Sequence, residues 1–129
     1  MLQKTREREE GKAKGTRLLK GVCMKRDEAL EFVSFLRGLG LRFEVVGGLY
    51  KGKPNVHDID LVVRLSDWEN SIFFSTLRSL NGKPPAVVEF YIADDVNYEP
   101  LCTALRATTH EAIKGRLMKG LRYRKRRWE

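Results

Sequence analysis

Two aspartates at alternate positions, Asp58 and Asp60, are the residues of this sequence with the clearest capacity for chemistry. They lie in residues 58–64, DIDLVVR, a run whose apolar and β-branched residues indicate a strand. Because alternate side chains of a strand share a face, both carboxylates should point one way while the apolar residues between and after them point into a core. Two adjacent carboxylates repel each other unless a cation lies between them. Mg²⁺ and Mn²⁺ prefer such oxygen ligands, so the pair predicts a site for a divalent cation.

A third carboxylate and a glycine turn extend this pattern. Glu89 lies in residues 86–92, AVVEFYI, which predict another strand, and a neighbouring position in the sheet would bring it to the aspartates. Gly47 and Gly48 follow a predicted short strand, and a tight Gly-Gly turn allows a close backbone approach to phosphates, with Lys51 adding positive charge. Carboxylates for metals beside a turn for phosphates describe phosphoryl transfer with two metal ions.

These motifs carry a resemblance to a known superfamily. Residues 45–63, VVGGLYKGKPNVHDIDLVV, resemble the signature of DNA polymerase β-like nucleotidyltransferases, in which a Gly-Gly/Ser turn precedes an Asp-x-Asp pair. The nine residues between Gly48 and Asp58 match the spacing typical of family X polymerases. Residues 88–92 resemble the later strand that supplies the third carboxylate of that family. The resemblance implies a palm fold.

The resemblance also implies an activity: metal-dependent transfer of a nucleoside monophosphate from an NTP or dNTP to a hydroxyl acceptor, with release of pyrophosphate. Two Mg²⁺ or Mn²⁺ ions would be the cofactors. The catalytic and metal-ligating residues would be Asp58, Asp60 and Glu89, and Glu89 would also help to deprotonate the acceptor. The residues that bind the nucleotide phosphates would be Gly47, Gly48 and Lys51. Three of these depart from the commoner family residues, since Gly48 replaces Ser, Lys51 replaces Arg and Glu89 replaces Asp.

The elements that must position these residues follow from periodicity and breaker residues. The expected order is helix, strand, strand, helix, strand, helix, over residues 27–36, 41–46, 58–64, 66–80, 86–92 and 108–119. Residues 49–57 are expected to form a turn or short helix that leads into a loop. Asp94, Asp95 and Asn97 predict a turn, and Pro100 suits the first turn of a helix. This order predicts an α/β (α+β) fold, a small mixed sheet of about three to five strands with helices packed on it. We expect the nucleotidyltransferase domain to span residues 21–120, after a basic, flexible N-terminal arm (1–20) and before a basic C-terminal tail (121–129).

Composition limits the class of protein. A chain of 129 residues, 42% hydrophobic and 33% charged, has room for one compact domain with a core. The length leaves no space for a separate thumb domain, so templated synthesis by this chain alone is not expected. No apolar run approaches the roughly 18 residues of a membrane span, and the charged start does not resemble a signal peptide. These features predict a cytoplasmic protein without membrane contact.

The net charge of +8 is unevenly distributed. Residues 1–26 carry +6 and residues 114–129 carry +7, whereas residues 27–113 carry −5. Basic ends suit DNA or RNA, because contacts with phosphates release counterions. They equally suit solvated segments that keep a small protein soluble.

Two interpretations of other classes therefore remain beside the enzyme. One is a catalytically weak or inactive palm-fold module that binds nucleic acid through its basic ends. The other is an antitoxin-type protein that pairs with a small helical protein, as minimal members of the resembled superfamily do.

Overall fold

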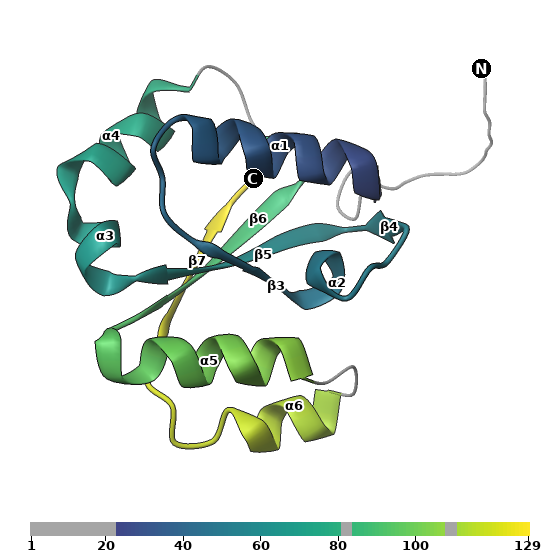
Figure 1. Cartoon of the computed structure of the whole chain (residues 1–129), viewed down its shortest axis with the longest axis vertical. Coiled ribbons are helices and arrows are strands. Elements are labelled where there is room, and N and C mark those ends of the chain that lie inside the picture. The colour runs from purple at the N-terminus through teal and green to yellow at the C-terminus, as the bar shows by residue number, and fades with distance from the viewer. Residues whose placement is uncertain (1–22, 81–83, 108–110) are drawn as a thin grey trace.

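A four-stranded mixed sheet forms the centre of the protein (Figure 1). The computed structural model describes residues 23–80, 84–107 and 111–129. The strands, in their order across the sheet, are β3 (Glu44–Val46), β5 (Asp58–Arg64), β6 (Val87–Ala93) and β7 (Arg124–Trp128). The two central strands, β5 and β6, run parallel, and β3 and β7 pair with them antiparallel. This arrangement confirms the expected mixed sheet of an α/β (α+β) fold.

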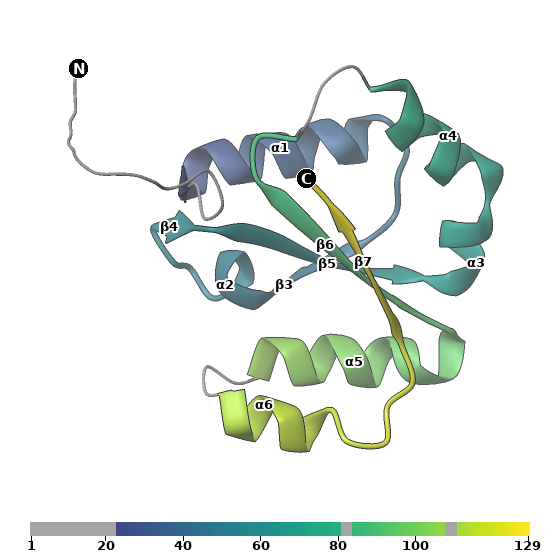
Figure 2. The same ribbon diagram turned by 180° about the vertical axis from the view of Figure 1, so that it is seen from behind.

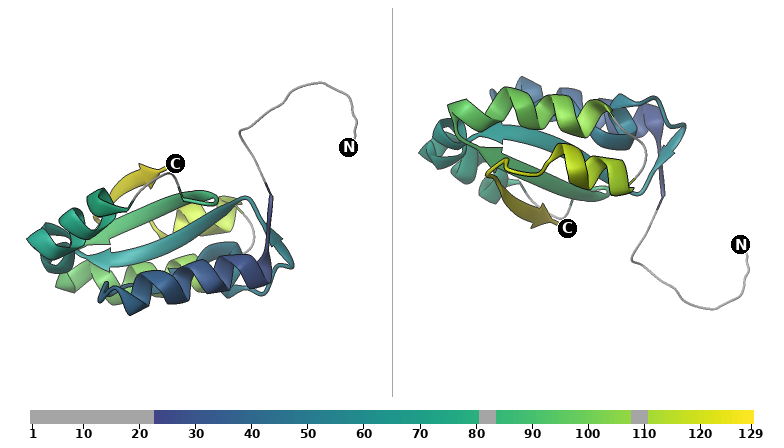
Figure 3. Two further views of the ribbon diagram at one scale, coloured as in Figure 1. Left: turned by 90° about the horizontal axis from the view of Figure 1, so that it is seen from above. Right: turned by 90° about the horizontal axis from the view of Figure 1, so that it is seen from below.

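Helices cover both faces of the sheet (Figures 1 and 2). One face is covered by α1 (Arg26–Gly38), α3 (Leu65–Glu69) and α4 (Ser71–Ser79). The other face is covered by α5 (Asp95–Ala107), on which α6 (Glu111–Leu117) packs. In the two opposite views of Figure 3, α1 lies in front of the strands on one side, and α5 and α6 lie in front on the other. Every helix in the described ranges is too short or too polar to span a membrane.

A short segment links β3 to β5 at one end of the sheet. It contains the four-residue helix α2 (Gly47–Tyr50) and the strand β4 (Asn55–Val56). β4 pairs antiparallel with β2 (Met24–Lys25), the two residues that precede α1. Residues 49–57, expected to form a turn or short helix followed by a loop, therefore contain the second half of α2 and the whole of β4.

The central strands are buried on both faces, and their side chains divide as the alternation predicts. Ile59, Leu61 and Val63 lie in the apolar cluster beneath α1. Val62 and Tyr91 lie in the second cluster, beneath α5. Asp58, Asp60 and Val62 occupy alternate positions of β5 and therefore lie on the same face of the sheet. The prediction that the aspartates share one face and that the residues alternating with them face the other way is confirmed.

Two predicted helices differ from those observed. The helix expected over residues 66–80 is two helices, α3 and α4, because Asn70 adopts an extended conformation between them (φ −64°, ψ 130°). The residues around Asp95, expected to be a turn, already form the start of α5. Asp94 caps it, since its carboxylate accepts a hydrogen bond from the backbone N–H of Asn97 at 3.0 Å. Pro100 consequently lies inside the helix, not in its first turn.

The main correction concerns residues 121–129, which we expected to be a basic tail. Arg124–Trp128 instead form β7, which pairs with β6 along its length. Because nearly all of these residues are cationic, the sequence lacks the alternation of polar and apolar residues that marks a strand. The long aliphatic stems of Lys and Arg can nevertheless cover a sheet. The Trp128 ring packs on Phe32, with the ring centroids 6.0 Å apart. Residues 1–20, expected to be an arm, and residues 108–110, expected to begin the last helix, lie outside the described ranges.

Candidate active site

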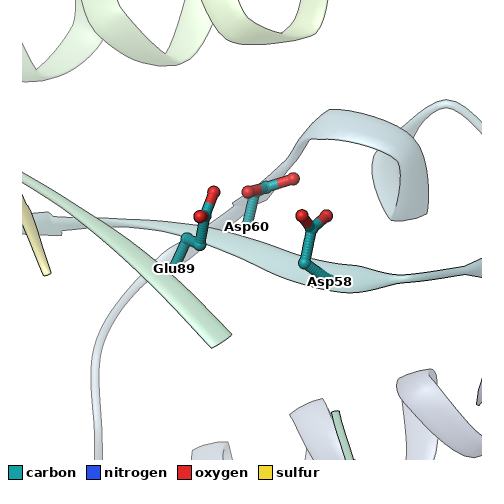
Figure 4. Close-up of side chains that lie close together, drawn as sticks. All are labelled: Asp58, Asp60 and Glu89. Atoms are coloured by element: carbon teal, nitrogen blue, oxygen red, sulfur yellow. The ribbon is translucent and has the colours of Figure 1, made fainter. Parts of the chain in front are cut away.

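Three carboxylates meet on the face of the sheet that α5 covers (Figure 4). Parallel pairing of β5 with β6 places Asp60 opposite Glu89, and Asp58 lies two residues before Asp60 on the same face. One carboxylate oxygen from each of the three residues lies within 4.8 Å of the others. The structure therefore brings together the three carboxylates that the sequence proposed for one site, and it does so through the register of two neighbouring strands.

The predicted glycine turn, Gly47 and Gly48, forms the start of the short helix α2 and lies directly beside these carboxylates. Val46, the last residue of β3, pairs with Asp60, so Gly47 follows at the same end of the sheet. Gly47 has φ +71°, and a Cβ built on it would overlap Oδ2 of Asp60. A glycine is required here by backbone conformation and also by the space that the Asp60 carboxylate occupies.

Gly48 is under a weaker constraint. A Cβ at this position would lie 3.1 Å from Cδ of Lys53, a contact that a small movement of the flexible lysine relieves. The turn itself is fixed by backbone hydrogen bonds, from Lys51 N to Gly47 O at 3.0 Å and from Lys53 N to Gly48 O at 3.1 Å. The fold would therefore accept the serine that many members of the resembled superfamily carry at this place.

The carboxylates and the turn open onto one cavity of about 790 Å³. All six residues that the sequence proposed for the site line this cavity: Gly47, Gly48, Lys51, Asp58, Asp60 and Glu89. Further cationic and aromatic side chains line it that the sequence did not indicate, namely Lys53, Lys114, Lys125, Tyr91 and Tyr123. The cavity thus combines an acidic cluster with a surrounding set of lysines, a charge pattern suited to a metal-bound polyphosphate.

The residues missed from the sequence come largely from the last third of the chain. Lys125 and Tyr123 belong to β7 and the residue before it, and Lys114 belongs to α6. The sequence did contain a pattern typical of a strand, because Tyr123, Lys125 and Arg127 lie at alternate positions, as residues on one face of a strand do. The uniform positive charge of the segment hid this pattern.

The carboxylate of Asp60 is disfavoured in its ionised form by its surroundings. Burial, reinforced by the charges of Asp58 and Glu89 and a hydrogen bond with Glu89, raises the pKa of Asp60 from 3.8 to about 7, while Lys114 opposes this change. Burial and the same carboxylates also raise the pKa of Tyr91, which lies beside Glu89 on β6. A cation bound among these oxygens would relieve both effects. The donor set, three carboxylates without nitrogen or sulfur, fits a hard dication such as Mg²⁺ or Mn²⁺.

Comparison of the chain with protein-family models, with curated proteins and with solved structures finds no match in any of the three.

Proposed function

We propose that this protein is a metal-dependent nucleotidyltransferase of the DNA polymerase β-like type. It would transfer a nucleoside monophosphate from an NTP or dNTP to a hydroxyl acceptor and release pyrophosphate. The observation that carries the proposal is the convergence of Asp58, Asp60 and Glu89 beside the Gly47–Gly48 turn, in one cavity. The acidic triad alone would be weak support, because carboxylates often cluster on protein surfaces without binding a metal. The position of the triad against Gly47, where a side chain would overlap the Asp60 carboxylate, adds support to the proposal.

The three carboxylates, the two glycines and Lys51 would each have a role in this reaction. Asp58, Asp60 and Glu89 would hold two Mg²⁺ or Mn²⁺ ions. Bound there, the ions would lower the pKa of the acceptor hydroxyl and neutralise the charge of the leaving pyrophosphate. The Gly47–Gly48 backbone would approach the phosphates closely, and Lys51 would contribute positive charge beside them.

The bond changes are those of a simple displacement. The acceptor oxygen forms a bond to the α-phosphorus, and the bond from that phosphorus to the α–β bridging oxygen breaks. Its electron pair leaves with pyrophosphate. The hydroxyl proton passes to Glu89, which lies at the edge of the cluster nearest to β7.

A transfer assay tests the proposal directly. The protein is incubated with each labelled NTP and dNTP, Mn²⁺ and a panel of acceptors that includes DNA and RNA 3′ ends, protein and small molecules. We expect label transfer by the wild type and a loss of at least about a hundredfold in Asp60→Asn. The matched control is Glu31→Gln, the same carboxylate-to-amide change at an exposed position of α1. If no acceptor is labelled by the wild type, or if Asp60→Asn retains full transfer, the proposed activity is wrong.

One observation favours a second candidate, a nucleic-acid-binding module without turnover. Four consecutive cations, Arg124 to Arg127, are exposed along β7, one of the two edge strands of the sheet. Their binding to DNA or RNA should weaken steeply as salt rises. Because β7 belongs to the sheet, deletion of residues 121–129 would damage the fold. The double variant Arg124→Gln/Arg126→Gln is the sharper test, and an unchanged salt dependence would count against this candidate.

A further inference from the structure

Lys125 occupies a position that the reaction described above does not use. It lies on β7 opposite Tyr91. Its Nζ is 3.3 Å from Oε1 of Glu89 and 5.3 Å from the centre of the Tyr91 ring. The Glu89 side chain is 12% exposed and that of Lys125 51% exposed. One member of the ion pair is thus held within the sheet, and the other reaches it from solvent.

The register of β6 and β7 makes this pairing selective. Arg127, not Lys125, stands directly opposite Glu89, yet the guanidinium of Arg127 pairs with Glu129 at 3.6 Å. The two cations share one face of one strand and are almost equally exposed. They differ in the type of cationic group, in position and in partner, so Arg127 is a control for the loss of a positive charge from this face of β7.

Glu89 cannot give the same oxygen fully to both an ammonium group and a divalent cation. A lysine is a compact point charge on a flexible stem of four carbons, and a half-exposed one can leave its partner at little cost. The cavity that Lys125 lines also contains the glycine turn, so a released ammonium group remains close to any phosphate bound there.

We propose that Lys125 is the resident counterion of the carboxylate cluster. It neutralises Glu89 in the metal-free protein, competes with the divalent cation for that carboxylate, and moves to the nucleotide phosphates once the cation is bound. This inference rests on the proposed function and identifies a further nucleotide-binding residue for the same site. It has two consequences of opposite sign: removal of the Lys125 charge strengthens binding of the metal alone and weakens binding of the nucleotide.

Metal binding alone tests the first consequence. Mn²⁺ affinity is measured by titration calorimetry and by electron paramagnetic resonance, in about 0.15 M salt to screen distant charges. Relative to wild type, we expect about five- to tenfold tighter binding by Lys125→Gln, the effect of losing a partly buried ion pair. Arg127→Gln, which removes the same charge from the same face, should change the affinity by less than about twofold. Lys125→Arg, which keeps the charge, should stay close to wild type.

Nucleotide binding tests the second consequence. With Mn²⁺ saturating each variant, the affinity for a non-hydrolysable nucleoside triphosphate should fall about three- to tenfold in Lys125→Gln and remain near wild type in Arg127→Gln. Circular dichroism and thermal unfolding of each variant show whether the sheet is intact. Because Lys125→Arg preserves both charge and strand, it keeps the comparison valid even if the Gln variant is less stable.

The outcomes separate this inference from the proposed function. If the wild type binds Mn²⁺, Asp58→Asn abolishes that binding, and Lys125→Gln binds no more tightly than Arg127→Gln, the counterion role is overturned while the metal site stands. Unchanged triphosphate affinity in Lys125→Gln overturns the transfer to phosphate. If the wild type does not bind Mn²⁺ at all, both the inference and the proposed function are overturned.

Discussion

Replacement of Asp60 by Asn is expected to stabilise the metal-free protein at neutral pH, although it removes a proposed metal ligand. The carboxyl of Asp60 has a pKa of about 7 in the folded protein, against an ordinary value of 3.8. The folded state therefore holds this proton more tightly than the unfolded state. The resulting stabilisation is complete below pH 3.8 and is lost as the pH rises through about 7. Above that pH the wild type carries an ionised carboxylate that its surroundings disfavour.

The size of the effect follows from the same difference. A change from 3.8 to about 7 corresponds to about 4 kcal/mol at 1.36 kcal/mol per pKa unit, which is an upper value for the cost at pH 8. At pH 4.5 the cost has fallen to about 1 kcal/mol. Asparagine has nearly the same shape, is neutral at every pH, and can donate to Glu89 through its amide. We expect Asp60→Asn to gain about 2–4 kcal/mol at pH 8 and about 1 kcal/mol or less at pH 4.5.

Urea unfolding at both pH values, in the presence of a chelator, measures the difference. Midpoints and slopes are compared for wild type, Asp60→Asn and the control Glu31→Gln, which should change stability by less than about 0.5 kcal/mol at either pH. A gain that does not grow with pH, or a loss of stability in Asp60→Asn at pH 8, would refute the electrostatic account of the cluster.

Three further predictions concern the glycine turn, the metal and β7. Gly47→Ala should lose about 2 kcal/mol or more and weaken Mn²⁺ binding, because a Cβ there is strained and displaces the Asp60 carboxylate. Gly52→Ala, also at positive φ but in open space, should lose only about 1 kcal/mol of stability and leave the Mn²⁺ affinity unchanged. Equal effects of the two variants on Mn²⁺ affinity would contradict a contact between Gly47 and the metal site. Mn²⁺ at a hundredfold excess over its Kd should stabilise the wild type by about 2.7 kcal/mol in thermal unfolding, and a chelator should reverse this; the same stabilisation in Asp60→Asn would place the metal elsewhere. Trp128→Ala should lose about 1–2 kcal/mol through its lost packing on Phe32, whereas a tail residue would lose nothing measurable in urea unfolding.

The sequence predicted well those parts of the fold in which buried apolar residues alternate regularly with polar ones. Residues 58–64 were assigned as a strand with the observed bounds, because Ile59, Leu61 and Val63 alternate with the aspartates. The same alternation placed both carboxylates on one face. That Glu89 would join them depended on the pairing of β5 with β6, a contact between distant segments that local patterns do not encode.

The parts that were missed depend on tertiary contacts. β7 was taken for a tail because its residues are nearly all cationic, and only the presence of β6 beside it makes a strand of them. Pro100 suggested a helix start, but the cap at Asp94 makes the helix begin at Asp95, five residues before the proline. For the same reason the sequence supplied one lysine of the cavity, Lys51, and not the others, since most of those come from the segments whose place in the fold it did not predict.

Glu89 lies on β6, between its partner strands β5 and β7, and this position affects the register in which β6 pairs with β5. In β6 the neighbours of Glu89, Val88 and Phe90, face the apolar cluster beneath α1. A slip of β6 by one residue against β5 would turn Glu89 into that cluster, away from Lys125, where an unpaired carboxylate costs several kcal/mol. It would also expose two apolar side chains to a cavity lined with lysines. The residue proposed for catalysis thus helps the chain to reject the nearest incorrect register while it folds.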